Sequence, residues 1–356
     1  MAEKKKDEVD RYLIVTEPIA DLRREPLDPA RGDYEYDDLQ ETQLLLNEVL
    51  LYRGENDEWY QLEAIEQSDF TPEVLWRGYP GWVRKRAVRE VKKVKRNTIV
   101  IKGKGAYVYT EPDQSSKTIM TVSMGTRFHA TDEIMGGFCQ VSLPKGGNGW
   151  VVKRNTRDMA RKIDEKQLRR RIVSTAKLFL CVPYLWGGRS TCYASSEFPA
   201  LRSSGFANAE GEGVRSSELN ANLKLKQPAS GYPDSKLAGI ACGVDCSGLT
   251  NLVFRANNID IPRNAHVQWM VTPKITQEAM QPGDLVFVSN VGEFYKISHV
   301  MIYLGGDEFI EALETGTIVK INSFRDKFGK TLVELAKQDL VIENKKIYCG
   351  KMPVSK

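Results

Sequence analysis

The first part of the chain alternates between hydrophobic and polar positions in short runs, a pattern typical of β-strands. Residues 44–52 and 98–101 are two of these runs, and Gly, Asp and Pro residues separate them from their neighbours. The pattern changes after about residue 160, because the apolar residues between 168 and 180 recur at helical spacing. The chain is therefore predicted to begin with a β-rich part of about 155 residues, which a helix follows.

A weak internal repeat divides the β-rich part in two. Residues 77–83 recur as residues 146–151, 68 positions later, and a similar order of short elements precedes each copy. Two small barrels of about 60–90 residues fit this pattern. The Gly-x-Gly-Trp-Val pattern of the repeat resembles that of bacterial SH3-like domains. We therefore expect one SH3-like barrel over residues 1–95 and a second over residues 96–160.

Composition places the chain among soluble globular proteins. It has 356 residues, of which 41% are hydrophobic and 28% are charged, so two or three domains are expected and a disordered or collagen-like chain is excluded. No stretch approaches the ~20 apolar residues that span a bilayer, so no membrane partner is expected. The first residues lack the apolar segment of a secretory signal. A cytoplasmic protein is therefore expected, or a secreted one if a leader has been removed.

The net charge of +4 conceals a strong asymmetry along the chain. Residues 1–80 hold 9 Lys and Arg against 21 Asp and Glu, and residues 81–172 hold 22 against 8. A basic segment of this kind can bind nucleic acid or an anionic polymer. Because the acidic and basic segments are adjacent, we favour electrostatic complementarity between them, and nucleic acid is not an expected partner.

The six cysteines are too few for a disulfide scaffold, and without a signal peptide their thiols are expected to be reduced. Cys242 and Cys246 are four positions apart, which is not the spacing of a CxxC metal or redox site. The chain has only three histidines. We therefore expect no structural zinc site and no other metal.

Cys246 is a candidate nucleophile because of its position. The apolar residues Leu249, Leu252 and Val253 follow it at helical spacing, which predicts a helix that begins at Cys246. The unpaired N–H groups and the dipole at a helix N-terminus favour a thiolate. The alternative is that Cys246 is a small buried hydrophobic residue, as most cysteines are.

His299 is the candidate base. It opens an apolar run that ends in a glycine turn, and a second strand follows over residues 308–312. A hairpin of these two strands would bring His299 close to Glu311. Glu311 could then accept a hydrogen bond from one ring nitrogen and direct the other toward Cys246, as in a catalytic triad. The alternative for Glu311 is a solvated strand residue.

Five motifs in a fixed order complete this picture. They are residues 184–188, 245–249, 261–264, 281–287 and 299–300. Together they look like the NlpC/p60 family of papain-like bacterial cell-wall cysteine peptidases, over about residues 165–350. The resemblance implies a multidomain protein in which two all-β SH3-like barrels precede an α+β papain-like catalytic domain. This domain would span residues 161–356, with an insertion at about residues 189–242.

The two barrels narrow the resemblance to γ-D-glutamyl-L-diamino acid endopeptidases of the dipeptidyl-peptidase VI type, which act on peptidoglycan stem peptides without a cofactor. Carried over, Cys246 is the nucleophile and His299 the base. Glu311 takes the third position, where relatives usually have His, Asn or Gln. Tyr184 matches the tyrosine whose hydroxyl could help bind the oxyanion. The alternative for Tyr184 is a packed aromatic residue.

In this branch of the family the substrate carries a free N-terminal L-Ala, whose ammonium group needs carboxylates in a closed pocket. Asp245 matches one such carboxylate, and Glu48 and Tyr79 of the first barrel are expected to form the closing wall. Ser247 and Arg263 complete the expected substrate-binding residues. The alternative is that Glu48 lies on a solvated strand and that Tyr79 only packs against the turn.

The chain departs from the family in two places. Asn264 and Ala265 follow Arg263, where relatives have Asp and Ser, so recognition of the diamino acid is in question. The insertion at about residues 189–242 is rich in Ser, Gly, Asn and Ala and lacks periodicity, which predicts a surface segment. Its position favours a lid or an added binding wall, and an inert excursion is the alternative.

The leading hypothesis is a monomeric cysteine peptidase that acts on L-Ala-γ-D-Glu-diamino acid peptides during cell-wall recycling. The alternative is a non-catalytic protein that binds the cell wall or a partner through its SH3-like barrels and carries a decayed catalytic domain. An acyltransferase with the same fold is a third hypothesis, although no membrane segment supports it. The sequence leaves the choice between diaminopimelate and lysine open.

Overall fold

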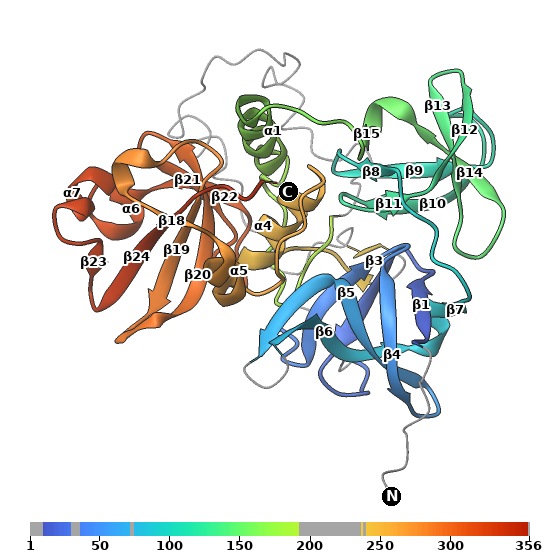
Figure 1. The fold of residues 1–356 in the computed structure, drawn as a ribbon, viewed down its shortest axis with the longest axis horizontal. Coiled ribbons are helices and arrows are strands. Elements are labelled where there is room, and N and C mark those ends of the chain that lie inside the picture. Colours follow the sequence, from blue (N-terminus) through green and yellow to red (C-terminus); the bar gives the residue numbers. More distant parts are fainter. Residues whose placement is uncertain (1–9, 30–35, 72–74, 192–235, 238–239, 355–356) are drawn as a thin grey trace, which may run out of the picture.

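The computed structural model describes residues 10–29, 36–71, 75–191, 236–237 and 240–354 (Figure 1). Two strand-rich regions come first, and a region in which helices pack against a sheet follows them. Most of the predicted insertion, residues 192–235 and 238–239, lies outside the described residues. The expectation that the insertion forms a lid concerns these residues and stays a prediction.

The first strand-rich region is one antiparallel sheet of seven strands with the order β3-β2-β6-β5-β4-β1-β7. The strands are β1 (Tyr12–Val15), β2 (Ile19–Arg23), β3 (Gln40–Leu45), β4 (Val49–Glu55), β5 (Trp59–Thr71), β6 (Leu75–Arg84) and β7 (Val88–Val91), with the 3-10 turn η1 (Lys85–Ala87) between the last two. Alternating residues such as Leu13, Leu50 and Leu62 are fully buried and form its core. The β-rich character that the alternation predicts is therefore confirmed.

The second strand-rich region consists of a five-stranded sheet, β10-β9-β14-β13-β12, and a three-stranded sheet, β11-β8-β15. Its elements are β8 (Ile99–Ile101), β9 (Gly105–Tyr109), β10 (Thr118–Ser123), β11 (Arg127–Phe128), β12 (Ala130–Met135), β13 (Phe138–Ser142), β14 (Asn148–Val152), η2 (Lys153–Asn155) and β15 (Thr156–Asp158). The repeat is visible in the register, because Trp82 lies opposite Gln61 and Trp150 lies opposite Gln140. The two copies therefore occupy equivalent strand pairs.

The third region has a sheet with the order β18-β24-β19-β20-β21-β22, with β23 paired to β24. Its helices and turn are α1 (Glu165–Lys177), α4 (Cys246–Arg255), α5 (Ala265–Val271), η3 (Gln277–Ala279), α6 (Phe324–Phe328) and α7 (Leu332–Ala336). Its strands are β16 (Lys236–Leu237), β17 (Ile240–Ala241), β18 (Lys274–Ile275), β19 (Leu285–Asn290), β20 (Glu293–Gly305), β21 (Glu308–Glu311), β22 (Lys320–Ser323), β23 (Val341–Ile342) and β24 (Lys345–Gly350).

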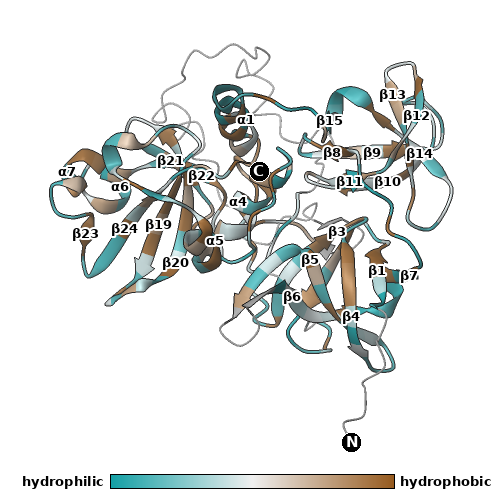
Figure 2. Cartoon of the chain, in the orientation of Figure 1, coloured by the Kyte–Doolittle hydropathy of each residue, from teal (hydrophilic) through white to brown (hydrophobic). Residues whose placement is uncertain are grey.

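This sheet is covered by helices on both faces. Leu285 and Phe287 of β19 pack into the same core as α1 and α4, whereas Val286 and Val288 pack into a core with α6 and α7. Figure 2 shows hydrophobic residues on these strands, while α1 carries both hydrophilic and hydrophobic residues. Helix α4, which begins at Cys246, thus packs against both the sheet and α1, and this packing fixes the position of the nucleophile.

Ion pairs join the acidic segment, residues 1–80, to the basic segment, residues 81–172, as expected. Within the described residues these pairs are Arg84 with Asp28 and Glu58, Lys85 with Glu55, Arg127 with Glu66, and Lys145 with Glu17. Glu66 also pairs with Arg255 of α4. The acidic surface of the first region is therefore shared between the second region and the helix that carries Cys246.

The cysteines depart from one expectation. Cys139, Cys181, Cys246 and Cys349 are free thiols, whereas Cys242 is disulfide-bonded. The expectation that all thiols are reduced is therefore wrong for Cys242, because sequence spacing does not show which cysteines meet in space.

None of the described helices is long and apolar enough to span a membrane.

Candidate active site

The first turn of α4 presents the candidate nucleophile. Cys246 is partly exposed at the start of the helix, and the Asp245 side chain caps it by accepting a 2.6 Å hydrogen bond from the N–H of Gly248. A Cβ at Gly248 would lie 2.1 Å from the carbonyl oxygen of Gly188. Only glycine therefore allows residues 184–188 to pack directly against the first turn of α4.

The hairpin of β20 and β21 brings the candidate base and its partner together, as the sequence predicts. His299 lies on β20 and Glu311 ends β21. His299 Nε2 is 2.8 Å from Glu311 Oε2, and Cys246 is close enough to the imidazole to raise its pKa. Glu311 is fully buried, so it is not the solvated strand residue of the alternative interpretation.

The electrostatics of the pair favour a protonated imidazole. Burial lowers the pKa of His299, but hydrogen bonds to Cys246 and Glu311 outweigh it and raise this pKa to about 9. Burial likewise raises the pKa of Glu311, but His299 and then Lys327 lower it to about 2. Near neutral pH an imidazolium therefore lies between the Cys246 sulfur and a carboxylate, which is the arrangement that activates cysteine nucleophiles.

Two further residues reach Glu311 that the sequence did not point to. Lys327 Nζ of α6 lies 2.6 Å from Glu311 Oε2, and Asn322 Nδ2 of β22 donates to Oε1 over 3.2 Å. No spacing rule marks Lys327, because its contact depends on how α6 packs on the sheet. Each oxygen of the buried carboxylate thus has at least one donor.

Tyr184 lies beside the nucleophile. It forms a β-bridge to Val244, two residues before Cys246. Burial, followed by the charges of Asp245 and Cys246, raises the pKa of the Tyr184 phenol well above its usual value of 10. The hydroxyl therefore stays protonated and remains a hydrogen-bond donor, as an oxyanion-binding role requires.

Asp245, Ser247 and Arg263 form one cluster. The Arg263 guanidinium binds both carboxylate oxygens of Asp245, with N–O distances of 3.0 and 2.6 Å, and donates to Ser247 Oγ over 2.8 Å. These three residues, which the sequence analysis expected to bind substrate, are therefore in direct contact. The charge of Asp245 is already balanced by Arg263, however, so Asp245 alone offers an ammonium group little net charge.

Comparison with known proteins agrees with this geometry. The model of the NlpC/P60 family matches residues 181–336, which include Cys246, His299 and Glu311, and the model of the bacterial SH3 domain matches residues 104–156. The chain therefore carries an NlpC/P60 domain. An SH3 domain precedes it.

Two curated relatives match most of the chain. The gamma-D-glutamyl-L-lysine dipeptidyl-peptidase of Bacillus subtilis is 24% identical over 286 residues, which cover 80% of this chain and 76% of that protein. The protein of the same name from Bacillus cereus is 23% identical and covers 79% and 69%. A crystal structure of an NlpC/P60 family protein from Bacillus cereus superposes with a TM-score of 0.65 at 19% identity, covering 96% of this chain and 99% of that one. The fold is therefore shared along nearly the whole length.

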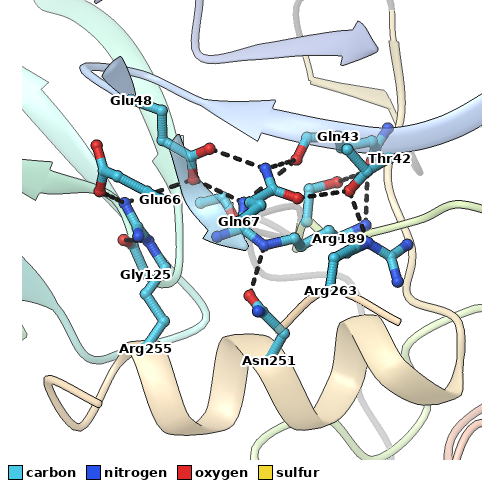
Figure 3. Close-up of polar contacts among 12 residues, drawn as sticks. Thr42, Gln43, Glu48, Glu66, Gln67, Gly125, Arg189, Asn251, Arg255 and Arg263 are labelled. Atoms are coloured by element: carbon cyan, nitrogen blue, oxygen red, sulfur yellow. Dashed lines mark hydrogen bonds and ion pairs between the residues drawn. The ribbon is translucent and has the colours of Figure 1, made fainter. Parts of the chain in front are cut away.

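Glu48 is where the structure corrects the sequence interpretation. Its side chain is fully buried, and its carboxylate binds Arg189 at 2.6 Å and Arg255 at 3.4 Å (Figure 3). Gln67 donates to it as well, over 2.9 Å. Glu48 is thus neither a wall of an open pocket nor a solvated strand residue. Two guanidinium groups already neutralise its carboxylate, so it cannot supply a countercharge for a ligand. Instead, its ion pairs anchor the first region to the NlpC/P60 domain.

Tyr79 does lie beside the NlpC/P60 domain. Its hydroxyl donates to Glu41 Oε2 over 3.0 Å and lies 3.3 Å from Asn264 Nδ2. Glu41, on β3, is a carboxylate that the sequence analysis missed, and its side chain is 21% exposed while also pairing with Arg24. Its signal was the polar run at residues 40–43, in which the other three residues are buried and Glu41 is not. The first region therefore meets the candidate site through Glu41 and Tyr79.

Proposed function

We propose that the chain is a cysteine peptidase that hydrolyses the bond between γ-D-Glu and a diamino acid in peptidoglycan stem peptides. One observation carries the proposal: Cys246 at a helix N-terminus is close enough to His299 to raise its pKa, and His299 hydrogen bonds to the buried Glu311. The names of the two Bacillus relatives support the choice of bond.

In the proposed mechanism, the Cys246 thiolate attacks the carbonyl carbon of the γ-amide. The Tyr184 hydroxyl and the N–H groups at the start of α4 stabilise the oxyanion that forms. His299 transfers its proton to the leaving amine, which departs and leaves a thioester on Cys246. A water molecule then gives its proton to His299 and attacks the thioester, which releases the acid and restores the thiolate–imidazolium pair.

We also propose that the substrate has a free N-terminal L-Ala, recognised by Glu41 and Tyr79 rather than by Glu48. Glu41 is partly exposed and binds the same Tyr79 hydroxyl as Asn264, which directly follows Arg263 of the Asp245 cluster. Arg263 is buried and balances Asp245, whereas Glu41 pairs with the exposed side chain of Arg24, which an ammonium group of the substrate can replace. The choice between diaminopimelate and lysine stays open.

Two departures from the family, Glu311 at the third position and Asn264-Ala265 after Arg263, are the features that favour the alternative of a decayed catalytic domain. Glu311 accepts a hydrogen bond from His299, as an orienting residue does, so its identity is compatible with catalysis. The monomeric state and the cytoplasmic location stay predictions.

The test is hydrolysis of L-Ala-γ-D-Glu-meso-diaminopimelate and of its lysine analogue. Wild type is expected to release the diamino acid from at least one peptide, and Cys246→Ala is expected to release none. Failure to cleave either peptide would overturn the proposal and favour the binding-protein alternative.

A second arm tests recognition of the amine. N-acetylation of the substrate is expected to raise KM strongly for wild type. Glu41→Gln is expected to raise KM for the free amine while leaving the acetylated peptide unaffected. Equal effects of Glu41→Gln on both peptides would contradict recognition of the amine by Glu41.

A further inference from the structure

The third residue of this catalytic site carries a charge. Glu311 is fully buried and has a lowered pKa, whereas the resembling family usually has His, Asn or Gln there. A buried carboxylate is unfavourable unless it is paired and hydrogen bonded. The neighbours of Glu311 therefore decide whether it can replace a neutral residue.

Two cationic groups meet at one oxygen of Glu311. His299 Nε2 and Lys327 Nζ lie 2.8 and 2.6 Å from the same atom, Oε2, and Asn322 Nδ2 binds the other oxygen. The Lys327 side chain is 16% exposed, so its ammonium group is shielded from water for the most part. Lys327 thus adds a positive charge at the same point where His299 donates its hydrogen bond.

We propose that Glu311 and Lys327 act together as one electrically neutral orienting group for His299, with Lys327 as a positioning residue. This inference rests on the proposed function as a cysteine peptidase. The pair presents an acceptor to Nε2, as a neutral Asn or Gln does, while its two charges cancel each other at His299.

The electrostatic reason lies in the proton that His299 must both hold and release. A carboxylate without Lys327 would stabilise the imidazolium further and make it a poorer acid toward the leaving amine. Lys327 without Glu311 would repel the imidazolium and favour neutral imidazole. Together they leave His299 able to hold its proton and to transfer it.

The other titratable groups around this pair come from two helices. Cys246 of α4 raises the pKa of His299, and His266 of α5 accepts from the backbone N–H of Ile297, two residues along β20. Burial lowers the pKa of His266, so it contributes no charge near neutral pH. The charge balance at His299 is therefore set by Cys246, Glu311 and Lys327.

The test is a double-mutant cycle of Glu311→Gln and Lys327→Met, read as kcat/KM against pH. Glu311→Gln leaves an uncompensated cation, so it is expected to lower kcat/KM by about a hundredfold and to move the alkaline limb to lower pH. Lys327→Met is expected to move this limb to higher pH. The double variant, with a neutral glutamine, is expected to recover about tenfold over Glu311→Gln.

Two controls separate charge from structure. Lys327→Arg keeps the charge and is expected to keep the alkaline limb in place. Lys330→Met removes a lysine of the same segment that contacts Gln338 instead, and it is expected to leave the pH profile unchanged. Losses that simply add up in the double variant, or an alkaline limb that Lys327→Met does not move, would overturn the proposal.

A readout without substrate separates this proposal from the proposed function. The rate of alkylation of Cys246 by iodoacetamide is measured against pH in the same variants, with Cys246→Ala as the background for the other thiols. Opposite shifts of this profile in the two single variants are expected even if no peptide is cleaved. Unshifted profiles would overturn the neutral pair, whatever the outcome of the peptide assay.

Discussion

At the residue scale, the account depends on a protonated His299. Its pKa is about 9, because hydrogen bonds to Cys246 and Glu311 outweigh burial, which alone would lower it. We expect kcat/KM to fall as the pH rises through about 9, since neutral His299 can no longer protonate the leaving amine. The measurement is the pH profile of kcat/KM, and a descending limb near the ordinary histidine pKa of about 6.5 would contradict the account.

The same pKa shift has a consequence for stability. A pKa that is raised in the folded state stabilises it fully below the unfolded value of 6.5 and no longer does so once the pH has risen through about 9. The difference in unfolding free energy between wild type and His299→Gln is therefore expected to shrink over this range. Urea titrations at several pH values measure it, and a difference independent of pH would show that the shift is absent.

Single residues also show how far the sequence could be interpreted. His299 and Glu311 could be placed together because they lie on consecutive strands, where the turn fixes the register. Glu48 could not, because its burial depends on Arg189 and Arg255, which lie far away in the sequence. The residue type shows that a side chain is charged, but the local sequence does not show whether a residue far away in the chain neutralises that charge.

At the element scale, the start of α4 depends on close packing against residues 184–188. A Cβ at Gly248 would lie 2.1 Å from the Gly188 carbonyl oxygen, which belongs to the backbone and cannot move cheaply. Gly248→Ala is therefore expected to displace the first turn of α4, and with it Cys246, and to lower both stability and activity.

The size of that effect can be calibrated with a second glycine. Gly103 has only an ordinary contact at 3.6 Å, so Gly103→Ala is expected to change little. The loss for Gly248→Ala is expected to exceed about 2 kcal/mol, as backbone displacement from overpacking does. Equal melting temperatures for the two variants would contradict the packing argument.

The sequence predicted individual helices and strands better than it predicted which of them pack against each other. The alternation of residues 98–101 and the helical spacing after Cys246 both correspond to observed elements, β8 and α4, because these spacings match the periods of a strand and of a helix. The packing of α6, which brings Lys327 to Glu311, left no such mark. The periodicity of apolar residues indicates the type of an element, but it does not indicate which other element packs against it.

At the scale of the whole molecule, the first region is joined to the NlpC/P60 domain by buried ion pairs. Glu48 lies between Arg189 and Arg255, and all three side chains are at most 1% exposed. Glu48→Gln leaves two buried guanidinium groups with less countercharge, so it is expected to lower the free energy of unfolding by about 3–5 kcal/mol. Urea denaturation measures this loss.

An exposed pair gives the matched comparison. Glu90 pairs with Arg11, and both side chains are well exposed, so Glu90→Gln is expected to cost about 1 kcal/mol or less. If Glu48→Gln is no more destabilising than Glu90→Gln, the buried pairs do not hold the two regions together.

The central claim is that Cys246 forms a covalent intermediate with the D-Glu γ-carbonyl. The most direct test is to mix the enzyme with L-Ala-γ-D-Glu-diamino acid, quench with acid within the first turnover, and determine the mass of the peptide that contains Cys246. The account predicts an added L-alanyl-D-glutamyl group on Cys246 that is absent from Cys246→Ala. Turnover with no adduct on Cys246, or turnover that persists in Cys246→Ala, would contradict it.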